Sequence, residues 1–467
     1  MTNAIKQSLR DSKAARWGAL AVVSFTMLTG YYINYVISPL KPLLEEQFLW
    51  TSSDFGLWNS AYGWFNVFFL MLIFGGIILD KMGVRFTGLG ASITMLIGTL
   101  FQYVAIEYGN SDLLSGNLFG VKTQIAVGAF GFAVFGVGVE VAGITVSKVI
   151  VKWFKGKELA LAMGLEMATA RMGTALALAL PYPMATAWFG TREFPTLSAP
   201  VMLGLALLVA GLIAFIWYTF MDRKLEKSEG ISDEVSEEDE FKIRDIFFIL
   251  KNKGFWLIAF LCVLFYSGIF PFLYFATDLM INKYGVDPEF AGTIPSLLPF
   301  GTIFLTPLFG SIYDNKGKGA TIMLIGSIML LIIHVVFSIP ALNNYILAIS
   351  LIILLGITFS LVPSAMWPSV PKIIPEKQLG TAYALIFWVQ NWGLMGVPLL
   401  IGWALDKSNP ERIEAIAKGS TDLPPYDYTV PMMIFAVTGL LAIFVAFMLK
   451  AEDKKKGYGL ELPNIEK

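Results

Sequence analysis

Charged residues and cysteine are scarce in this chain. Of its 467 residues only 15% are Asp, Glu, Lys or Arg, and the formal net charge is −1, whereas a soluble domain carries about 25% charged residues. The single cysteine, Cys262, excludes an internal disulfide and a cysteine metal cluster. A net charge near zero predicts no nucleic-acid partner, because such proteins present a basic surface. No nucleophile–base pair and no metal-ligand spacing occurs, so the sequence predicts neither an enzyme nor a cofactor or metal.

Apolar residues are abundant instead. They make up 56% of the chain, and its mean hydropathy is +0.67. A run of about 20 apolar residues is long enough to cross a lipid bilayer as a helix. The sequence therefore predicts an all-α integral membrane protein with twelve transmembrane helices. The apolar runs are approximately 17–38, 55–79, 87–106, 124–151, 158–189, 199–221, 255–282, 289–313, 319–339, 344–373, 378–405 and 430–449.

Lysine and arginine gather in one set of loops and in both terminal segments. This set includes Arg16, Lys81, Lys155 and Lys318, while the opposite loops hold few cations. The positive-inside rule then predicts that both termini are cytoplasmic. The first 16 residues contain no small-residue cleavage site, so we expect a retained tail rather than a signal peptide.

Two copies of one loop pattern divide the chain into halves. GGIILDKMGVR follows the second apolar run and FGSIYDNKGKG follows the eighth. The matching positions, each 234 residues apart, are Gly76 and Gly310, Asp80 and Asp314, and Gly83 and Gly317. The expected organisation is a six-helix bundle over 1–221, a polar linker of mixed charge over 222–254, and a second six-helix bundle with a tail over 255–467.

Two pseudo-symmetric six-helix bundles with Gly-x-x-x-Asp-x-x-Gly in matching loops resemble the major facilitator superfamily. The resemblance implies a monomeric transporter that works by alternating access, with its substrate site at mid-membrane. Asp80 is then expected to cap or pair with a helix end of the opposite half, and Arg85 to join that network while the protein faces outward. The simpler alternative is that these charges only anchor the loop.

Glu140 and Arg171 are candidates for a site within the apolar runs. Glu140 lies 15 residues before Lys155 in the intervening turn, and Arg171 lies 16 residues after it. At about 1.5 Å of rise per residue, both lie roughly 22 to 24 Å from that face of the membrane. A charged side chain at mid-bilayer costs at least about 2.5 kcal/mol, so each needs a partner or water. The pair is either a clamp for a zwitterion or an ion pair between two helices.

Two longer stretches resemble one branch of the superfamily, that of the vertebrate lysosomal dipeptide transporter. They are SKVIVKWFKGKELALAMGLEMATARMGTA and AMWPSVPKIIPEKQLGTAYALIFWVQNWGL. In that branch the matching acid and arginine hold the amino and carboxyl ends of a dipeptide, and a tryptophan lines the same pocket. The resemblance thus implies a substrate clamp made of Glu140, Arg171 and Trp367, and uniport.

The chain also departs from that branch. It has no Asn-x-Ser/Thr glycosylation acceptor and no acidic dileucine in its short N-terminal tail. We therefore expect a prokaryotic cytoplasmic membrane as its location and no accessory subunit. Glu166 stands where the branch has an amide. About 140° of helix rotation separates it from Arg171, so it need not share the pocket.

Polar and aromatic residues within other runs are further candidates for the lining of a substrate cavity. Mid-span amides carry the most weight because they need partners. The aromatic residues could equally serve packing or the membrane interface. The candidates are Tyr35, Asn59, Tyr62, Tyr266, Gln390 and Asn391.

Three functions follow from these residues. The first is transport of dipeptides or similar small zwitterions. The second is transport of mono- or dicarboxylates, in which Arg171 binds the anion and Glu140 serves structure or proton coupling. The third is a membrane receptor that transports nothing, against which the duplicated loop argues.

Overall fold

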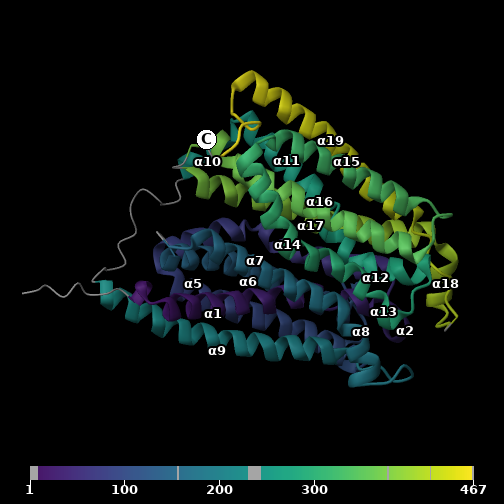
Figure 1. The fold of residues 1–467 in the computed structure, drawn as a ribbon. Helices are drawn as coiled ribbons and strands as arrows, with labels where there is room; N and C mark the ends of the chain where they lie inside the picture. Colours follow the sequence, from purple (N-terminus) through teal and green to yellow (C-terminus); the bar gives the residue numbers. More distant parts are fainter. Residues whose placement is uncertain (1–8, 155–156, 230–242, 376–377, 421, 465–467) are drawn as a thin grey trace, which may run out of the picture.

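The computed structural model describes residues 9–154, 157–229, 243–375, 378–420 and 422–464. Long helices lie side by side over most of these residues (Figure 1), so the predicted all-α class is confirmed. One short antiparallel hairpin pairs Asn117 with Lys122. Residues 155–156 of the predicted turn KWFKGK and the central part of the predicted linker, 230–242, lie outside the described residues.

The bounds of the elements follow in chain order. They are η1 Leu9–Asp11, α1 Lys13–Tyr35, η2 Ser38–Leu40, α2 Lys41–Phe48, α3 Ser52–Ser60, η3 Ala61–Gly63, α4 Trp64–Phe68, α5 Met71–Glu107, η4 Asp112–Leu114, β1 Asn117–Leu118, β2 Val121–Lys122, α6 Thr123–Phe154, α7 Leu159–Ala179, α8 Pro181–Pro183, η5 Met184–Trp188, α9 Ser198–Glu229, α10 Ile243–Leu250, α11 Lys253–Ser267, α12 Phe270–Tyr284, α13 Pro288–Ala291, α14 Thr293–Lys316, α15 Gly319–Ser338, α16 Tyr345–Ile373, α17 Leu379–Ser408, α18 Pro410–Ala417 and α19 Thr429–Lys456.

Ten helical runs among the described residues are long and apolar enough to cross a membrane. The predicted run 55–79 has no span of its own among these ten, because its residues from Met71 onward begin the long span Met71–Glu107, and the predicted run 158–189 is not among them. The first is divided into short helices, with a break at Leu70, whose φ is 54°. The second carries Glu166 and Arg171, which make it less apolar. Both segments still pack among the long helices, α3 against α17 and α7 against α1, so they fit the predicted twelve-helix arrangement.

The helices pack as two sets. In the N-terminal set, α1 contacts α7 and α9, and α5 contacts α6 and α9. In the C-terminal set, α11 contacts α17 and α19, and α14 and α15 contact α16. The main contacts between the sets are α3 with α17 and α7 with α14. The helix α9 continues to Glu229 and α10 begins at Ile243, so both ends of the predicted linker 222–254 are helical. The domain boundaries themselves remain a prediction.

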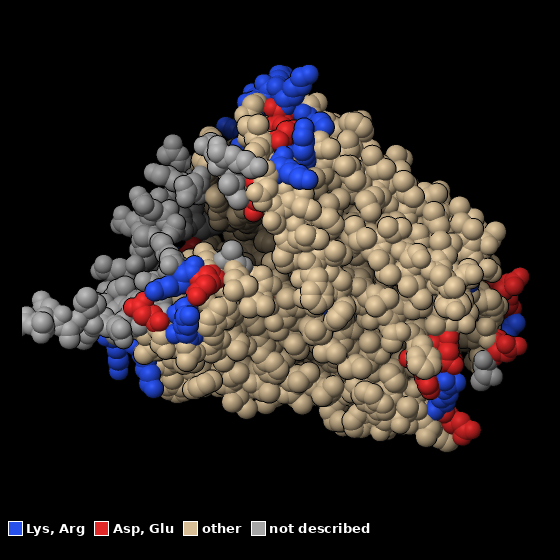
Figure 2. Space-filling model, in the orientation of Figure 1, with Lys and Arg blue, Asp and Glu red and all other residues tan. Residues whose placement is uncertain are grey.

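The surface separates into an apolar flank and two charged ends. Figure 2 shows Lys, Arg, Asp and Glu gathered at the ends, with a continuous tan flank between them. Large apolar side chains such as Ile213, Phe220 and Phe444 are more than half exposed on this flank. A helix bundle with exposed apolar flanks is stable where lipid covers it. We call the end where α1 begins and α9 and α19 finish the cation-rich end, and the other the cation-poor end.

Between the two sets the molecule is hollowed at the cation-rich end (Figure 2). At the cation-poor end the sets are in close contact. A Cβ atom placed on Gly56 of α3 would lie 2.5 Å from the carbonyl oxygen of Pro398, and one on Gly402 of α17 would lie 2.2 Å from that of Ser52. Only glycine permits such an approach of two backbones. The structure is therefore open at one end and closed at the other.

The two copies of the loop pattern share one backbone feature. Gly83 has φ 74° within α5, and Gly317 has φ 68° at the end of α14. Both values lie in the left-handed region that glycine adopts without strain. The predicted turns therefore lie at equivalent places in the two halves.

Candidate functional site

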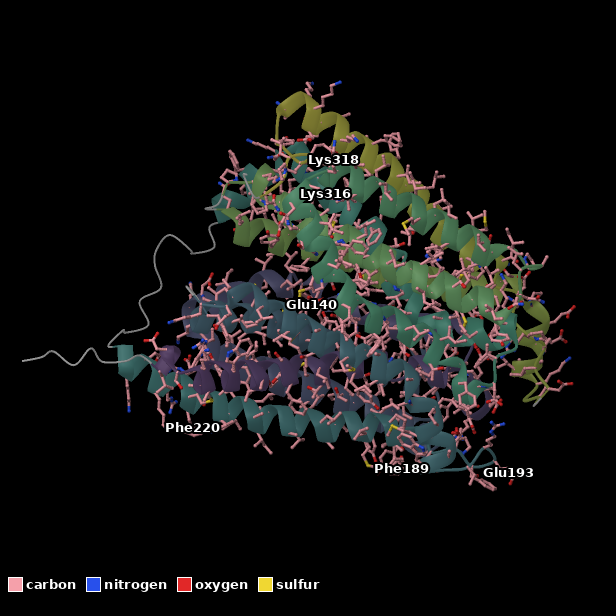
Figure 3. All side chains as sticks on the ribbon, viewed as in Figure 1. Glu140, Phe189, Glu193, Phe220, Lys316 and Lys318 are labelled. Carbon is pink, nitrogen blue, oxygen red and sulfur yellow. The ribbon has the colours of Figure 1, made fainter. Side chains whose placement is uncertain are left out.

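The hollow leads to a cavity of about 280 Å³ between the two sets. Glu140 lies in this space between them (Figure 3). Of the residues that the structure describes, three charged ones line the cavity, namely Glu140, Glu166 and Arg171. Of the sequence candidates, those that line it together are Glu140, Arg171, Trp367, Tyr62, Tyr266 and Gln390.

Glu140 of α6 is oriented by a tyrosine of the short helix η3. The Tyr62 hydroxyl donates to Glu140 Oε1 at 2.8 Å. Gly136, one turn before Glu140, makes this approach possible, because a Cβ there would lie 2.2 Å from the Tyr62 carbonyl oxygen. The Asn391 amide of the C-terminal set also interacts with this carboxylate. One oxygen is thus oriented by Tyr62, which leaves the carboxylate able to bind a ligand cation.

Arg171 is surrounded by aromatic rings. Its guanidinium carbon lies 4.7 Å from the ring centroid of Phe359, 5.5 Å from that of Phe270 and 5.7 Å from that of Tyr31. Such cation–π contacts stabilise a cation without neutralising it. No carboxylate lies within 4 Å of Arg171 among the residues that the structure describes. Its hydrogen-bond donors are therefore free for a ligand anion, which a guanidinium binds in bidentate fashion.

Trp367 contributes a wall of the cavity from α16. Its Nε1 donates to the Tyr266 hydroxyl at 3.0 Å, and its carbonyl oxygen accepts from Tyr383 at 3.3 Å. Its ring also lies 5.0 Å from that of Phe387, centroid to centroid. These contacts from α11 and α17 fix the orientation of the indole. The cavity therefore has a rigid aromatic face on the C-terminal set.

The other sequence candidates lie in different places. Tyr35 lines a smaller adjoining cavity of about 40 Å³, which Tyr62, Glu140 and Gln390 also line. Asn59 is fully buried in α3 and donates to the Phe55 carbonyl oxygen at 2.8 Å. Neither Asn59 nor Asn391 is among the described residues that line these two cavities. A role of these two in holding a substrate stays a prediction.

The rotation around the helix left open whether Glu166 shares the pocket, and the structure places it in the lining of the same cavity as Arg171. No lysine or arginine lies within 4 Å of its carboxylate in the described parts of the chain. The rotation of about 100° per residue gives only the direction in which a side chain leaves its Cα atom. A glutamate side chain is long, so its carboxylate can reach the cavity although its Cα atom points to one side of it.

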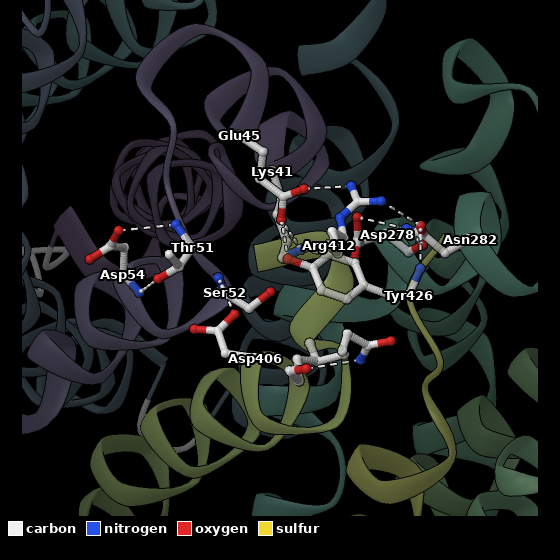
Figure 4. A network of polar contacts seen from close by, with 12 residues as sticks. Lys41, Glu45, Thr51, Ser52, Asp54, Asp278, Asn282, Asp406, Arg412 and Tyr426 are labelled. Atoms are coloured by element: carbon white, nitrogen blue, oxygen red, sulfur yellow. Dashed lines mark hydrogen bonds and ion pairs between the residues drawn. The ribbon is translucent and has the colours of Figure 1, made fainter. Parts of the chain in front are cut away.

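The closed end contains an ionic network that the sequence reasoning missed (Figure 4). Lys41 Nζ of the N-terminal set lies 3.0 Å from Asp278 Oδ2 of the C-terminal set. Arg412 Nη2 of α18 lies 2.6 Å from Glu45 Oε2 of α2. The four side chains are at most 8% exposed. Two cations thus neutralise two carboxylates, and both ion pairs cross between the sets.

Two tyrosines complete this network. The Tyr426 hydroxyl donates to Glu45 Oε1 at 3.0 Å, and the Tyr428 hydroxyl donates to Asp278. Burial raises the pKa of the Tyr426 phenol far above its ordinary value, so it remains a donor. The sequence signal was weak, because Lys41 and Arg412 look like ordinary loop cations until the halves are brought together.

A helix N-terminus adds a further link at the closed end. The backbone N–H groups of Ser52 and Ser53, the first residues of α3, donate to the Asp406 carboxylate of α17 at 2.9 and 2.7 Å. A carboxylate is stabilised at the positive end of a helix. Opening this end would expose these N–H groups and separate the two ion pairs.

In this structure the charges of the first copy of the loop pattern pair within their own half. Asp80 pairs with Lys148 of α6 at 2.8 Å, and Arg85 Nη1 lies 2.5 Å from Glu226 of α9. Gly76 and Gly310 have no atom within 4 Å of an added Cβ. The expected contact of Asp80 with the opposite half belongs to the outward-facing state and stays a prediction.

The second copy of the pattern is covered by the C-terminal segment. Asn464 donates to the Asp314 side chain at 2.8 Å, and the backbone N–H groups of Lys318 and Gly319 donate to the carbonyl oxygens of Glu461 and Leu460. A Cβ on Gly317 would lie 2.5 Å from the Glu461 carbonyl oxygen. Residues 460–464 therefore lie directly against this loop.

Comparison with known proteins agrees with this geometry. Residues 20–398 match the Major Facilitator Superfamily. The lysosomal dipeptide transporter MFSD1 of Danio rerio is 30% identical over 375 residues, which cover 78% of this chain and 75% of the relative. The hexuronate transporter of Bacillus subtilis is 21% identical over 83% of this chain and 88% of the relative. A bacterial homologue of the human lysosomal transporter Spinster superposes with a TM-score of 0.69 at 15% identity, over 95% of this chain and 98% of that one.

The expected location in a prokaryotic cytoplasmic membrane is wrong by these comparisons. Relatives that match over most of the chain, from several vertebrates, are named as lysosomal transporters. The prediction rested on missing glycosylation acceptors and a missing sorting signal, and such short surface motifs change without altering the fold. The multi-pass membrane arrangement stands.

Proposed function

The chain belongs to the Major Facilitator Superfamily and is a membrane transporter rather than an enzyme, and we propose that it moves dipeptides or similar small zwitterions by alternating access. The observation that carries this proposal is the state of Glu140 and Arg171. They line one cavity, yet no ion pair joins them. An acid and a cation that face common space without neutralising each other suit a ligand with both charges. The named activity of the dipeptide-transporting relatives supports the same substrate class.

In this proposal the Arg171 guanidinium binds the substrate carboxylate with two parallel hydrogen bonds. Glu140 accepts hydrogen bonds from the substrate ammonium, while the Tyr62 hydroxyl keeps its carboxylate oriented. The Trp367 indole packs against the peptide from the opposite set. The cavity volume of about 280 Å³ lies just below the roughly 300–1,000 Å³ usual for small-molecule pockets, which favours a small ligand.

Alternating access follows from the distribution of these groups. Glu140 and Arg171 belong to the N-terminal set, whereas Trp367, Tyr266 and Gln390 belong to the C-terminal set. A bound substrate attracts both sets and favours their approach at the cation-rich end. The ion pairs at the cation-poor end must then separate for release on that side.

Uptake into proteoliposomes tests the proposal. Radiolabelled Ala-Ala should exchange across the membrane with wild type, and the exchange should fall at least tenfold with Arg171→Ala and with Glu140→Gln. Glu107→Gln, an exposed acid at the end of α5, serves as the matched control and should exchange normally. Unchanged exchange in both site variants would contradict the proposal that Glu140 and Arg171 hold the two ends of the substrate.

Transport of organic anions is the second candidate, because Arg171 is the one cation of the cavity lining and a hexuronate transporter is among the relatives. The two functions differ in the need for an ammonium group. N-Acetylated Ala-Ala and hexuronate lack one, so binding of these compounds with the affinity of Ala-Ala would favour the anion transporter.

A further inference from the structure

The charges that line the cavity do not balance. Glu140, Glu166 and Arg171 are its charged residues, two acids against one cation. The network at the closed end is different, since Lys41 and Arg412 neutralise Glu45 and Asp278. The imbalance is thus a property of the substrate cavity rather than of buried charges in this chain generally.

A zwitterionic dipeptide does not correct the imbalance. Its ammonium and carboxylate match Glu140 and Arg171 under the proposed function, which leaves the Glu166 carboxylate without a counter-charge. In the open structure this matters little, because the cavity is hollowed toward solvent and water can solvate the carboxylate (Figure 2). When the cavity closes around a substrate, an unpaired carboxylate would have to be buried, which is strongly unfavourable.

Among the described residues that line the cavity, Arg171 is the one positive charge, and none of the others supplies a second. The side chains that face this cavity from α1, η3, α11, α12, α16 and α17 are neutral, among them Tyr31, Tyr62 and Tyr266, and from α6 the one charged side chain is Glu140. The neighbouring α14 faces α7 with Thr302 and Thr306. Within α7 the only cation of the lining is Arg171. His334 is enclosed elsewhere, where Nε2 bonds to the Gly268 carbonyl oxygen at 2.8 Å.

We propose that Glu166 carries one proton with each zwitterionic dipeptide, so that transport is proton-coupled. The proton binds the Glu166 carboxylate from the solution that the cavity faces, the neutral side chain is enclosed with the substrate, and the proton leaves to the other side after the opposite end opens. This inference rests on the proposed function. It replaces the uniport that the family resemblance implied.

A pH gradient across proteoliposomes tests the coupling. The membrane potential is clamped with valinomycin and equal potassium, sodium is omitted, and radiolabelled Ala-Ala starts at equal concentration on both sides. One proton per neutral substrate predicts that a difference of about one pH unit drives about tenfold accumulation on the alkaline side. A pH-sensitive dye inside the vesicles should report proton entry with Ala-Ala.

Glu166→Gln separates coupling from binding. This variant should still exchange labelled for unlabelled Ala-Ala at equal pH, which shows that it is folded and binds substrate, but it should accumulate none in response to the gradient. Glu107→Gln should accumulate the substrate as wild type does. Exchange in wild type without accumulation would overturn the coupling alone, whereas loss of exchange in wild type would overturn the proposed function with it.

Two further outcomes would also overturn the proposal. Accumulation that follows a sodium gradient instead of pH would assign the counter-charge to a metal cation. If only dipeptides with a basic side chain were exchanged, and no protons moved, the counter-charge of Glu166 would come from the substrate.

Discussion

Gly402→Ala should open the cation-poor end. The added methyl group would lie 2.2 Å from the Ser52 carbonyl oxygen and 3.1 Å from the Gly56 Cα atom. Ordinary contact begins at 3.4 Å, so the overlap with the oxygen is about 1.2 Å. Both neighbours are backbone atoms, which no side-chain rotation can move away. The overlap is therefore relieved by separation of α3 from α17, which means separation of the two sets.

The size of the effect follows from measured overpacking. An extra methyl group in a close-packed contact costs typically about 1–3 kcal/mol. This cost applies to the state that is closed at the cation-poor end and disappears when the helices part. The ratio of the two states should therefore shift by about 5- to 150-fold toward the state that is open there.

Gly396→Ala is the matched control. Gly396 lies in the same helix, α17, and an added Cβ there has no atom within 4 Å. Both substitutions gain the same helix propensity of about 1 kcal/mol, so only the contact between the sets differs.

Spin labels report the opening. Glu193 and Glu414 are exposed residues of the two sets at the cation-poor end, and Cys262 is buried. Pulsed electron resonance between labels at Glu193→Cys and Glu414→Cys should show a larger population of long distances in Gly402→Ala than in Gly396→Ala. Equal distributions in the two variants would refute the reasoning.

Three further predictions concern other contacts. Arg412→Ala breaks a buried ion pair with Glu45, which typically costs about 3–5 kcal/mol, so the same labels should report opening, and unchanged distances would contradict this. Trp367→Phe removes the hydrogen bond to Tyr266 but keeps an aromatic ring, and calorimetry should show Ala-Ala binding weaker by about 0.5–1.5 kcal/mol rather than unaltered. Gly317→Ala overlaps the backbone of residues 461–463, so hydrogen exchange of residues 460–464 should accelerate, and equal protection would reject the contact.

The helical membrane fold could be predicted from the sequence because it depends on local composition. Apolar runs of sufficient length specify spans, and two copies of Gly-x-x-x-Asp-x-x-Gly reveal two halves. The cavity residues Glu140 and Arg171 were predictable for a related reason, since a charge within an apolar run must face water or a partner. Equal distance from one turn placed them at one depth, and the structure shows both on one cavity.

The closed end could not be predicted in this way. Lys41 and Asp278 are 237 residues apart, and Glu45 and Arg412 are 367 residues apart. No periodicity relates these pairs, because their contact depends on how the two sets meet. The place of Glu166 stayed open for another reason, since the angle around α7 alone does not say how far a long side chain reaches. The predicted membrane location was wrong because location depends on short surface signals rather than on how the helices pack.

The clamp itself is tested most directly by a thermodynamic cycle between the ends of the substrate and the two charged residues. Calorimetry would compare Ala-Ala with its C-terminal amide and its N-acetyl form, for wild type, Arg171→Ala and Glu140→Gln. The account predicts that amidation of the C-terminus weakens binding to wild type and to Glu140→Gln but has little effect on binding to Arg171→Ala. Acetylation of the N-terminus should weaken binding to wild type and to Arg171→Ala but have little effect on binding to Glu140→Gln. Equal losses for each modification in all three proteins would show that these residues do not hold the two ends.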